Sequence, residues 1–424
     1  MRFLIGAPAS GSGKTTVTLG LLRAFSRTQM IRSAKSGPDY IDPAFHAAAT
    51  GQACVNLDAW AMTPSRIRAL AAGADPLIVE GAMGLFDGAF PHGKGSSADL
   101  ARILNLPVVL VIDAGRMAGS VGALAQGFMR YDPAVHVAGV ILNNTGSPRH
   151  ESMLRHALGD VQIFGAIPRS PALHQGARHL GLIQAQERAD LEDFLYNAAD
   201  LMTQHLDMDA LARLGGTAPA PGLHSRPRPP GQRIAIARDT AFAFTYPHLL
   251  DDWRAAGAEI TFFSPLADDP VPDADVIYLP GGYPELHAGR IAGNQGFLAS
   301  LRRSQAVIYG ECGGYMVLGD GLIDADGRRH EMAGLLGLET SFATRKLHLG
   351  YRHLHATQGP FAGHWTGHEF HYASTIRAAG TPLFAATDAA GDALPPMGLI
   401  NQRVSGSFAH IIDAGPIALA QKQA

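Results

Sequence analysis

The chain has 424 residues, more than one hydrophobic core usually holds, so we expect two or three domains. Hydrophobic residues make up 46% and charged residues 17%, which is typical of a globular protein, and the net charge of −3 gives no reason to expect nucleic acid or an anionic membrane surface as a partner. Two cysteines cannot form a disulfide framework, and no apolar run resembles a membrane span or a signal peptide, so we expect a cytoplasmic protein.

The first predicted strand leads into a glycine-rich loop. Residues 2–7 are mostly apolar, and residues 17–25 show helical periodicity. Between them, glycines leave backbone N–H groups free to surround phosphates at the start of the helix. We therefore expect this loop to bind ATP through the following residues: Gly11, Ser12, Gly13, Lys14, Thr15 and Thr16.

Within this loop the side chains predict distinct roles. Lys14 is expected to reach the terminal phosphates of ATP, and Thr15 is expected to bind Mg²⁺. Pro8 stands where the strict phosphate-loop pattern has a glycine. The strand and helix on either side favour nucleotide binding over a merely flexible glycine loop.

The next stretch, Lys35 to His46, combines a lysine, two aspartates and a tyrosine around a Gly-Pro turn. Loops at the carboxyl ends of parallel strands are where ligands bind in such sheets. We expect Asp39 to hold a metal ion, and Tyr40 and Asp42 to face the substrate. The alternative is plain turn chemistry, since Asp and Pro are also turn formers.

Further apolar strands follow. Residues 76–80 end in Glu80, which is expected to be a Mg²⁺ ligand because it would neutralise the metal beside the phosphates. Three more strands are predicted at residues 108–113, 137–144 and 162–168. Asn143 could bond the edge of an adenine ring, although strand-end asparagines are more often caps. The alternation of strands and helices predicts a doubly wound parallel α/β sheet.

The second half of the chain repeats this alternation after a break. Residues 191–214 are expected to be helical, and residues 215–231 are a Pro/Gly-rich linker. The predicted domains are therefore residues 1–214, which bind ATP, and residues 232–424. Strands of the second, smaller α/β domain are predicted at the following residues: 233–237, 259–263, 275–279 and 306–309.

The last of these strands leads directly into a cysteine, in Gly310-Glu311-Cys312-Gly313-Gly314. Such a turn places a nucleophile on a strained strand-to-helix elbow, with backbone N–H groups beside it. A buried structural cysteine is the commoner alternative. A second glycine pair, at Gly281 and Gly282, and a histidine after a late strand, His410, favour the nucleophile.

These features resemble a class I glutamine amidotransferase domain. The resemblance implies that Cys312 attacks the side-chain amide of glutamine and that His410 lowers the pKa of the thiol and carries a proton to the departing ammonia. It also implies that the backbone N–H groups near Gly282 and Gly313 form the oxyanion and glutamine site.

Motifs along almost the whole chain are similar to those of the CobB/CbiA family, with a dethiobiotin-synthetase-like ATP domain followed by the amidotransferase domain. They are Pro8 to Thr16, Lys35 to His46, Val79-Glu80-Gly81, Gly139 to Asn143, Gly281-Gly282-Tyr283-Pro284, Gly310 to Met316, Arg345 to Arg352 and Gly367 to Tyr372. The family implies ATP- and glutamine-dependent amidation of the a and c acetate carboxylates of hydrogenobyrinic or cobyrinic acid through acyl phosphates, in cobalamin biosynthesis. ATP and Mg²⁺ are then the cofactors, and the corrinoid tetrapyrrole and L-glutamine are the substrates. The resemblance leaves open whether the chain forms a homodimer.

The chain departs from the wider amidotransferase pattern at two positions. His410 is followed by Ile411-Ile412-Asp413, without the carboxylate of the usual His-x-Glu, so the third member of the catalytic group is not assigned. Met316 occupies the position of a common glutamine contact, so that contact cannot be transferred.

Three histidines near Glu369, at positions 364, 368 and 371, suggest a metal cluster at first sight. His368 and His371 are badly spaced for one face of a strand, which favours packing or interdomain hydrogen bonding over zinc, with substrate contact second.

Three other functions compete with the diamide synthase. Two are enzymes: cobyric acid synthase and a nickel-tetrapyrrole a,c-diamide synthase. The third is a partitioning-type ATPase switch with a degenerate binding domain, against which Cys312 and His410 argue.

Overall fold

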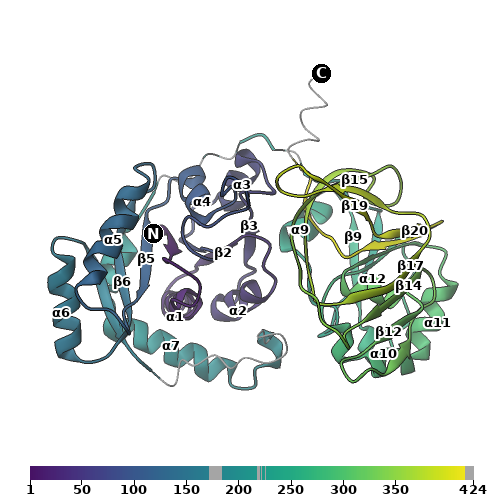
Figure 1. Cartoon of the computed structure of the whole chain (residues 1–424), viewed down its shortest axis with the longest axis horizontal. Coiled ribbons are helices and arrows are strands. Elements are labelled where there is room, and N and C mark those ends of the chain that lie inside the picture. Colours follow the sequence, from purple (N-terminus) through teal and green to yellow (C-terminus); the bar gives the residue numbers. More distant parts are fainter. Residues whose placement is uncertain (171–183, 217–219, 221, 225, 416–424) are drawn as a thin grey trace. The chain divides into compact units, whose positions relative to one another are not determined.

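The structure is a computed structural model, and it describes residues 1–170, 184–216, 220, 222–224 and 226–415. The chain divides into two compact units, Met1–His224 and Ser225–Ala424 (Figure 1). The division falls inside the expected linker, of which residues 217–219, 221 and 225 lie outside the described residues. Within the described ranges, no helix is both long and apolar enough to cross a membrane.

The first unit is built on a seven-stranded sheet in the order β3-β2-β4-β1-β5-β6-β7, with every neighbouring pair parallel. Its strands are β1 (Arg2–Gly6), β2 (Arg32–Ser36), β3 (Val55–Leu57), β4 (Leu77–Glu80), β5 (Val108–Asp113), β6 (Val137–Thr145) and β7 (Ile163–Pro168). The central strands β1 and β4 are buried throughout, which explains their nearly continuous apolar sequences. The predicted doubly wound parallel sheet is confirmed.

Helices cover this sheet (Figure 1). They are α1 (Lys14–Ser26), α2 (Ile41–Thr50), α3 (Pro64–Ala71), α4 (Ser97–Leu104), α5 (Ser120–Tyr131), α6 (Pro148–Leu158), α7 (Leu191–His205) and α8 (Met208–Arg213). Helices α1 and α7 pack against each other, as do α5 and α6. Leu19, Leu21 and Leu22 of α1 are completely buried, so this helix is held firmly where the phosphate loop ends.

Residues 191–214, which were expected to be helical, form two helices, α7 and α8, with a break at Leu206 and Asp207. Leu206 is extended and its backbone bridges to Gly165 of β7. The side chain of Asp207 then accepts a hydrogen bond from the N–H of Ala210 and starts a new helix.

Sheet register places functional side chains side by side in the first unit. Ile5 of β1 pairs with Glu80 of β4, and Lys35 of β2 pairs with the same glutamate from the other side. Parallel strands end at one edge of a sheet, so the loop after β1 begins next to Glu80.

The second unit has a six-stranded sheet in the order β20-β21-β11-β10-β8-β9, parallel except for the β20–β21 pair. Its strands are β8 (Arg233–Ala237), β9 (Glu259–Phe263), β10 (Val276–Leu279), β11 (Val307–Glu311), β20 (Leu399–Asn401) and β21 (Val404–Ser407). Its helices are α9 (Pro247–Ala255), α10 (Ala288–Gly293), α11 (Gln295–Arg303) and α12 (Gly313–Leu318). The four predicted strands are present.

Two further sheets, which the sequence patterns did not indicate, complete the second unit. One is β13-β12-β14-β17 and the other is the antiparallel β19-β18-β15-β16-β22. Their strands are β12 (Gly321–Ile323), β13 (Arg329–Glu331), β14 (Gly337–Ser341), β15 (His348–Ala356), β16 (Gly363–His371), β17 (Ser374–Ala379), β18 (Phe384–Thr387), β19 (Ala393–Met397) and β22 (His410–Asp413). Figure 1 shows these strands in green to yellow.

The link between β21 and β22 matters for function. Strand β21 belongs to the parallel sheet and β22 to the antiparallel sheet, so only Phe408 and Ala409 connect the two. Glu311 of β11 pairs with Ser407 of β21. His410, the first residue of β22, is therefore held close to the end of β11.

Candidate active site

The phosphate loop has the backbone that its glycines require. Gly11 and Gly13 have φ angles of 80° and 91°, in the left-handed region that favours glycine. A β-carbon at Gly13 would lie 2.1 Å from the side-chain nitrogen of Asn143. That nitrogen donates a 3.0 Å hydrogen bond to the carbonyl of Ser12. Asn143 thus braces the loop, and its contact with adenine stays a prediction.

Lys14 is the first residue of α1 and is buried at the loop. Its ammonium group donates to the carbonyl of Met83. Burial and the nearby charge of Lys35 lower the pKa of Lys14. Thr15 and Thr16 follow it in α1 and are partly buried.

Beside the loop, a hydroxyl, two carboxylates and an ammonium group form one cluster. The hydroxyl of Thr15 lies 2.7 Å from Oε1 of Glu80 and 3.5 Å from Oδ2 of Asp42. The ammonium group of Lys35 contacts the same two oxygens, at 2.9 Å and 2.5 Å. Burial alone would raise the pKa of Glu80, but the charges of Lys35 and His46 outweigh it and lower that pKa well below its usual range.

The oxygen atoms of this cluster fit Mg²⁺, which prefers hard oxygen ligands. Thr15, Glu80 and Asp42 supply them, and the ammonium group of Lys35 contacts the two carboxylates. Asp39 is placed differently. Its Oδ1 accepts from the N–H groups of Ile41 and Asp42 at the start of α2, and its Oδ2 lies 3.9 Å from Lys35.

Asp42, which the sequence analysis assigned to the substrate, is thus part of the Thr15 and Glu80 cluster. Burial and the neighbouring charge of Asp39 raise the pKa of Asp42 to about 7, against the opposing effect of Lys35. Tyr40 lies partly buried immediately before α2.

Two functional candidates of this cluster received no role from the sequence. Lys35 was noted only as part of a polar turn, although a lysine at the end of a buried strand signals a partner. His46 is completely buried, with Nε2 2.7 Å from Glu80 and Nδ1 3.4 Å from the sulfur of Cys54. Burial would lower the pKa of His46, but its contacts with Cys54 and Glu80 raise it to about 10. These residues fix the orientation of Glu80.

The cysteine elbow of the second unit is strained, as predicted. Cys312 has φ 46° and ψ −102° between β11 and α12, an uncommon conformation for a residue with a β-carbon. Its N–H donates to the carbonyl of Ser407 at 2.8 Å. A β-carbon at Gly314 would lie 1.9 Å from the carbonyl oxygen of Leu279, so this turn can form only with glycine there.

The loop after β10 approaches both the elbow and the histidine. A β-carbon on Gly281 would lie 2.4 Å from Cε1 of His410, so glycine allows the ring to approach. The amide nitrogen of Gly282 lies 3.2 Å from the position of a β-carbon on Gly313. The N–H of Gly313 hydrogen-bonds the sulfur of Cys312 and favours its thiolate. The loop of Gly281 and Gly282 therefore lies against His410 and against Gly313, the residue that follows Cys312.

The thiol itself is only 4% exposed. Burial, followed by the negative charge of Glu285, raises the pKa of Cys312 well above its usual range. We expected His410 to lower this pKa, but burial raises it, and the negative charges of Glu285, Glu311 and Glu369 add to that effect. The thiol is therefore protonated at neutral pH, and its attack on glutamine requires a base.

A carboxylate faces that base, although His410 lacks the usual acid two residues later. Oε2 of Glu311 lies 3.6 Å from Nδ1 of His410, and both side chains are 2% exposed. Glu311 is fixed in turn by the hydroxyl of Tyr278 at 2.8 Å and by the N–H of Ile411 at 3.1 Å. On its other side, the ring of His410 stacks on that of His368. Sequence reasoning missed Glu311, whose signal was an acid ending a buried strand directly before the nucleophile.

Comparisons with known proteins match two parts of the chain to two different domain families. Residues 233–416 match the model of a CobB/CobQ-like glutamine amidotransferase domain, and residues 32–177 match an AAA domain. A hydrogenobyrinate a,c-diamide synthase of Brucella abortus is 56% identical over 97% of this chain and 98% of its own length. Enzymes of the same name from Rhodobacter capsulatus and Rhizobium meliloti are 52% and 51% identical, over 96% and 97% of this chain and 98% of each relative. The chain belongs to the hydrogenobyrinate a,c-diamide synthase family.

Membership of this family joins the two sites into one activity. The chain is a glutamine-hydrolysing, ATP-dependent, amide-forming ligase. The cysteine elbow lies in the amidotransferase part, and Lys35 and Glu80 lie in the part that matches the AAA domain.

Proposed function

We propose that this chain converts hydrogenobyrinic acid to its a,c-diamide, with glutamine as the nitrogen donor and ATP as the activating agent. The observation that carries the proposal is the strained elbow at Cys312, with a glycine loop that contacts both Gly313 and His410, in a chain that also holds a phosphate loop. The names of relatives that are more than 50% identical over nearly the full length supply the substrate. The free thiols of Cys54 and Cys312 fit a reducing, cytoplasmic setting.

Release of ammonia from glutamine begins at the elbow. His410 takes the thiol proton as the sulfur of Cys312 attacks the amide carbon, and the N–H groups of Gly282 and Gly313 stabilise the oxyanion. His410 then gives the proton to the departing ammonia, and water hydrolyses the thioester to glutamate. Glu311 keeps the ring of His410 oriented throughout and stabilises its charged form.

Activation of the carboxylate occurs at the phosphate loop. A carboxylate oxygen of the tetrapyrrole attacks the terminal phosphate of ATP, ADP leaves, and ammonia displaces phosphate from the resulting acyl phosphate to give the amide. Lys14 stabilises the charge on the transferred phosphate. Thr15, Glu80 and Asp42 would hold Mg²⁺, with Asp39 nearby, and the ion would neutralise the phosphates. Tyr40 lies beside Asp42 and would contact the reacting carboxylate.

Mass spectrometry tests this assignment directly. The protein is incubated with ATP, Mg²⁺, glutamine and, in separate reactions, hydrogenobyrinic acid, cobyrinic acid and a nickel tetrapyrrole. We expect hydrogenobyrinic acid to undergo two successive replacements of OH by NH₂ and to give the highest kcat/KM. Preference for cobyrinic acid would contradict the metal-free substrate, and preference for the nickel tetrapyrrole would favour the nickel enzyme. More than two replacements would contradict the assignment and favour cobyric acid synthase.

A further inference from the structure

A cavity of about 430 Å³ opens beside the cysteine elbow. Its wall includes Tyr315 of α12, the helix that follows Cys312, together with Ser407 and Phe408 of the segment that leads to His410. The N–H of Cys312 bonds the carbonyl of Ser407, so this wall and the elbow share one backbone contact. Residues that bond or closely follow the elbow therefore form part of the cavity wall.

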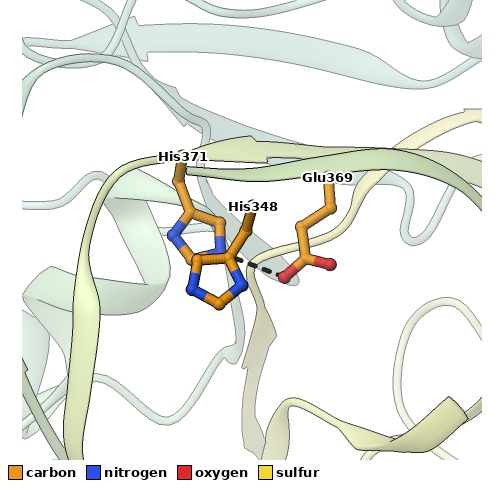
Figure 2. A group of neighbouring side chains, drawn as sticks. All are labelled: His348, Glu369 and His371. Atoms are coloured by element: carbon orange, nitrogen blue, oxygen red, sulfur yellow. Dashed lines mark hydrogen bonds and ion pairs between the residues drawn. The ribbon is translucent and has the colours of Figure 1, made fainter. Parts of the chain in front are cut away.

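An ion pair between Arg352 and Glu369 lies in the mostly apolar wall of the cavity. Nε and Nη2 of Arg352 lie 3.1 Å and 2.8 Å from Oε2 of Glu369, and Oε1 of Glu369 lies 3.0 Å from Nε2 of His371. The rings of His348 and His371 stack, with centroids 4.6 Å apart. Figure 2 shows Glu369 beside the two stacked rings. The side chains of Arg352 and Glu369 are 13% and 11% exposed, so both remain accessible from the cavity.

The charge state of the pair follows from its surroundings. Burial would raise the pKa of Glu369, but the hydrogen bond with His371 and the positive charges nearby lower it, so the side chain is a carboxylate at neutral pH. That carboxylate is also near enough to Cys312 to contribute to the raised pKa of the thiol. The imidazole of His371 is 6% exposed, and its Nδ1 has no hydrogen-bond partner among the described residues.

We propose that Arg352 and Glu369 bind the α-carboxylate and the α-ammonium group of the glutamine substrate. This inference rests on the proposed function. A guanidinium group beside a carboxylate presents one positive and one negative site, which matches the two charges of an α-amino acid. Bound in this way, glutamine would direct its amide from the charged pair toward the elbow. The pair would then supply the contact that Met316 cannot provide.

The positive charge of Arg352 argues against a metal ion at His348, Glu369 and His371. His348, Glu369 and His371 each offer one ligand atom within 4.8 Å of the others, as in Figure 2. However, the guanidinium of Arg352 already forms an ion pair with Glu369, and its positive charge would repel a metal ion bound there. A zwitterion is not repelled, because its carboxylate would face Arg352 and its ammonium group would face Glu369.

Two truncated substrates test the pair. Glutaramic acid lacks the α-ammonium group of glutamine, and γ-aminobutyramide lacks the α-carboxylate. Ammonia release is measured for both and for glutamine, in the presence of ATP and hydrogenobyrinic acid. Arg352→Gln should lower kcat/KM about 10- to 100-fold for glutamine and glutaramic acid but change it little for γ-aminobutyramide. Glu369→Gln should show the reverse preference, with glutaramic acid the least affected.

Arg329→Gln is the matched control, because Arg329 forms a 2.7 Å ion pair with Glu339 in the same unit and neither side chain lines the cavity. It should leave all three substrates unaffected. If Arg352→Gln and Glu369→Gln lower kcat/KM equally for all three substrates and also lower thermal stability, the pair has a structural role and the inference is wrong. Zn²⁺ binding that Glu369→Gln abolishes and glutamine does not compete with would overturn the inference in favour of a metal site. Failure of the wild-type protein to amidate hydrogenobyrinic acid with ammonium would instead count against the proposed function.

Discussion

The carboxylate of Glu311 lies 3.6 Å from Nδ1 of His410, although the two residues belong to different sheets. Glu311 ends β11, directly before the nucleophile, and His410 begins β22. The strand that carries the acid therefore also carries the cysteine. This arrangement places a carboxylate against the base without the usual His-x-Glu sequence.

We predict that Glu311→Gln lowers kcat for glutamine-dependent amidation about 100-fold and changes the KM for glutamine little, since the amide keeps the shape but loses the charge. Steady-state kinetics with glutamine and with ammonium measure this, and the loss should be confined to glutamine. Glu311→Asp should recover part of the rate. Glu339→Gln is the control, because that carboxylate forms an ion pair with the exposed Arg329 on β13. A raised KM with unchanged kcat would contradict the orienting role.

The second prediction concerns the approach of His410 to the glycine loop. Gly281→Ala should reduce glutamine-dependent turnover by at least about 10-fold, because the new methyl group would lie 2.4 Å from the imidazole and displace it. Gly289→Ala is a matched control, since its nearest neighbour would be 3.5 Å away. Normal activity of Gly281→Ala, with the protein folded by circular dichroism, would show that the ring need not occupy this position.

The third prediction separates the two half-reactions. Glu80→Gln should lower amidation about 100-fold with either glutamine or ammonium, because both routes need the activated carboxylate. It should also lower the free energy of unfolding by about 3 kcal/mol, since Lys35 and His46 lose a buried charged partner. Urea denaturation and product formation measure the two effects. Glu192→Gln, at an exposed carboxylate that pairs with Arg23, is the control.

Several features could be predicted from the sequence because they depend on local chemistry. Apolar runs predicted the parallel strands. A glycine-rich pattern between a strand and a helix predicted the phosphate loop, whose Gly11 and Gly13 have positive φ angles. The partners of Glu80 and His410 could not be predicted, because both contacts join residues far apart in the chain. Lys35 meets Glu80 through sheet register, and Glu311 meets His410 where two sheets adjoin. The antiparallel sheet was not predicted, because its polar strands, such as β15, are only partly buried and show no regular alternation of buried and exposed residues.

The fourth prediction concerns pH. The carboxyl group of Asp42 has a pKa of about 7 in the folded protein against 3.8 ordinarily, so the folded state retains a proton that the unfolded chain releases. The contribution of Asp42 to stability therefore falls as pH rises from about 4 to about 7 and is constant above that. Between about pH 5 and about pH 8, the wild-type protein should lose on the order of 2 kcal/mol more unfolding free energy than Asp42→Asn. Urea denaturation at both pH values measures this, and parallel losses in the two proteins would contradict it.

The central claim is that the thiol of Cys312 supplies the ammonia that the ATP-dependent reaction consumes. The most direct test is mass spectrometry of the product that Cys312→Ala forms from hydrogenobyrinic acid and ATP, with glutamine in one reaction and ammonium in the other. Cys54→Ala, which removes the other thiol, is the control and should use glutamine normally. We predict that Cys312→Ala forms the diamide with ammonium and none with glutamine. An unchanged rate of diamide formation from glutamine would contradict the account.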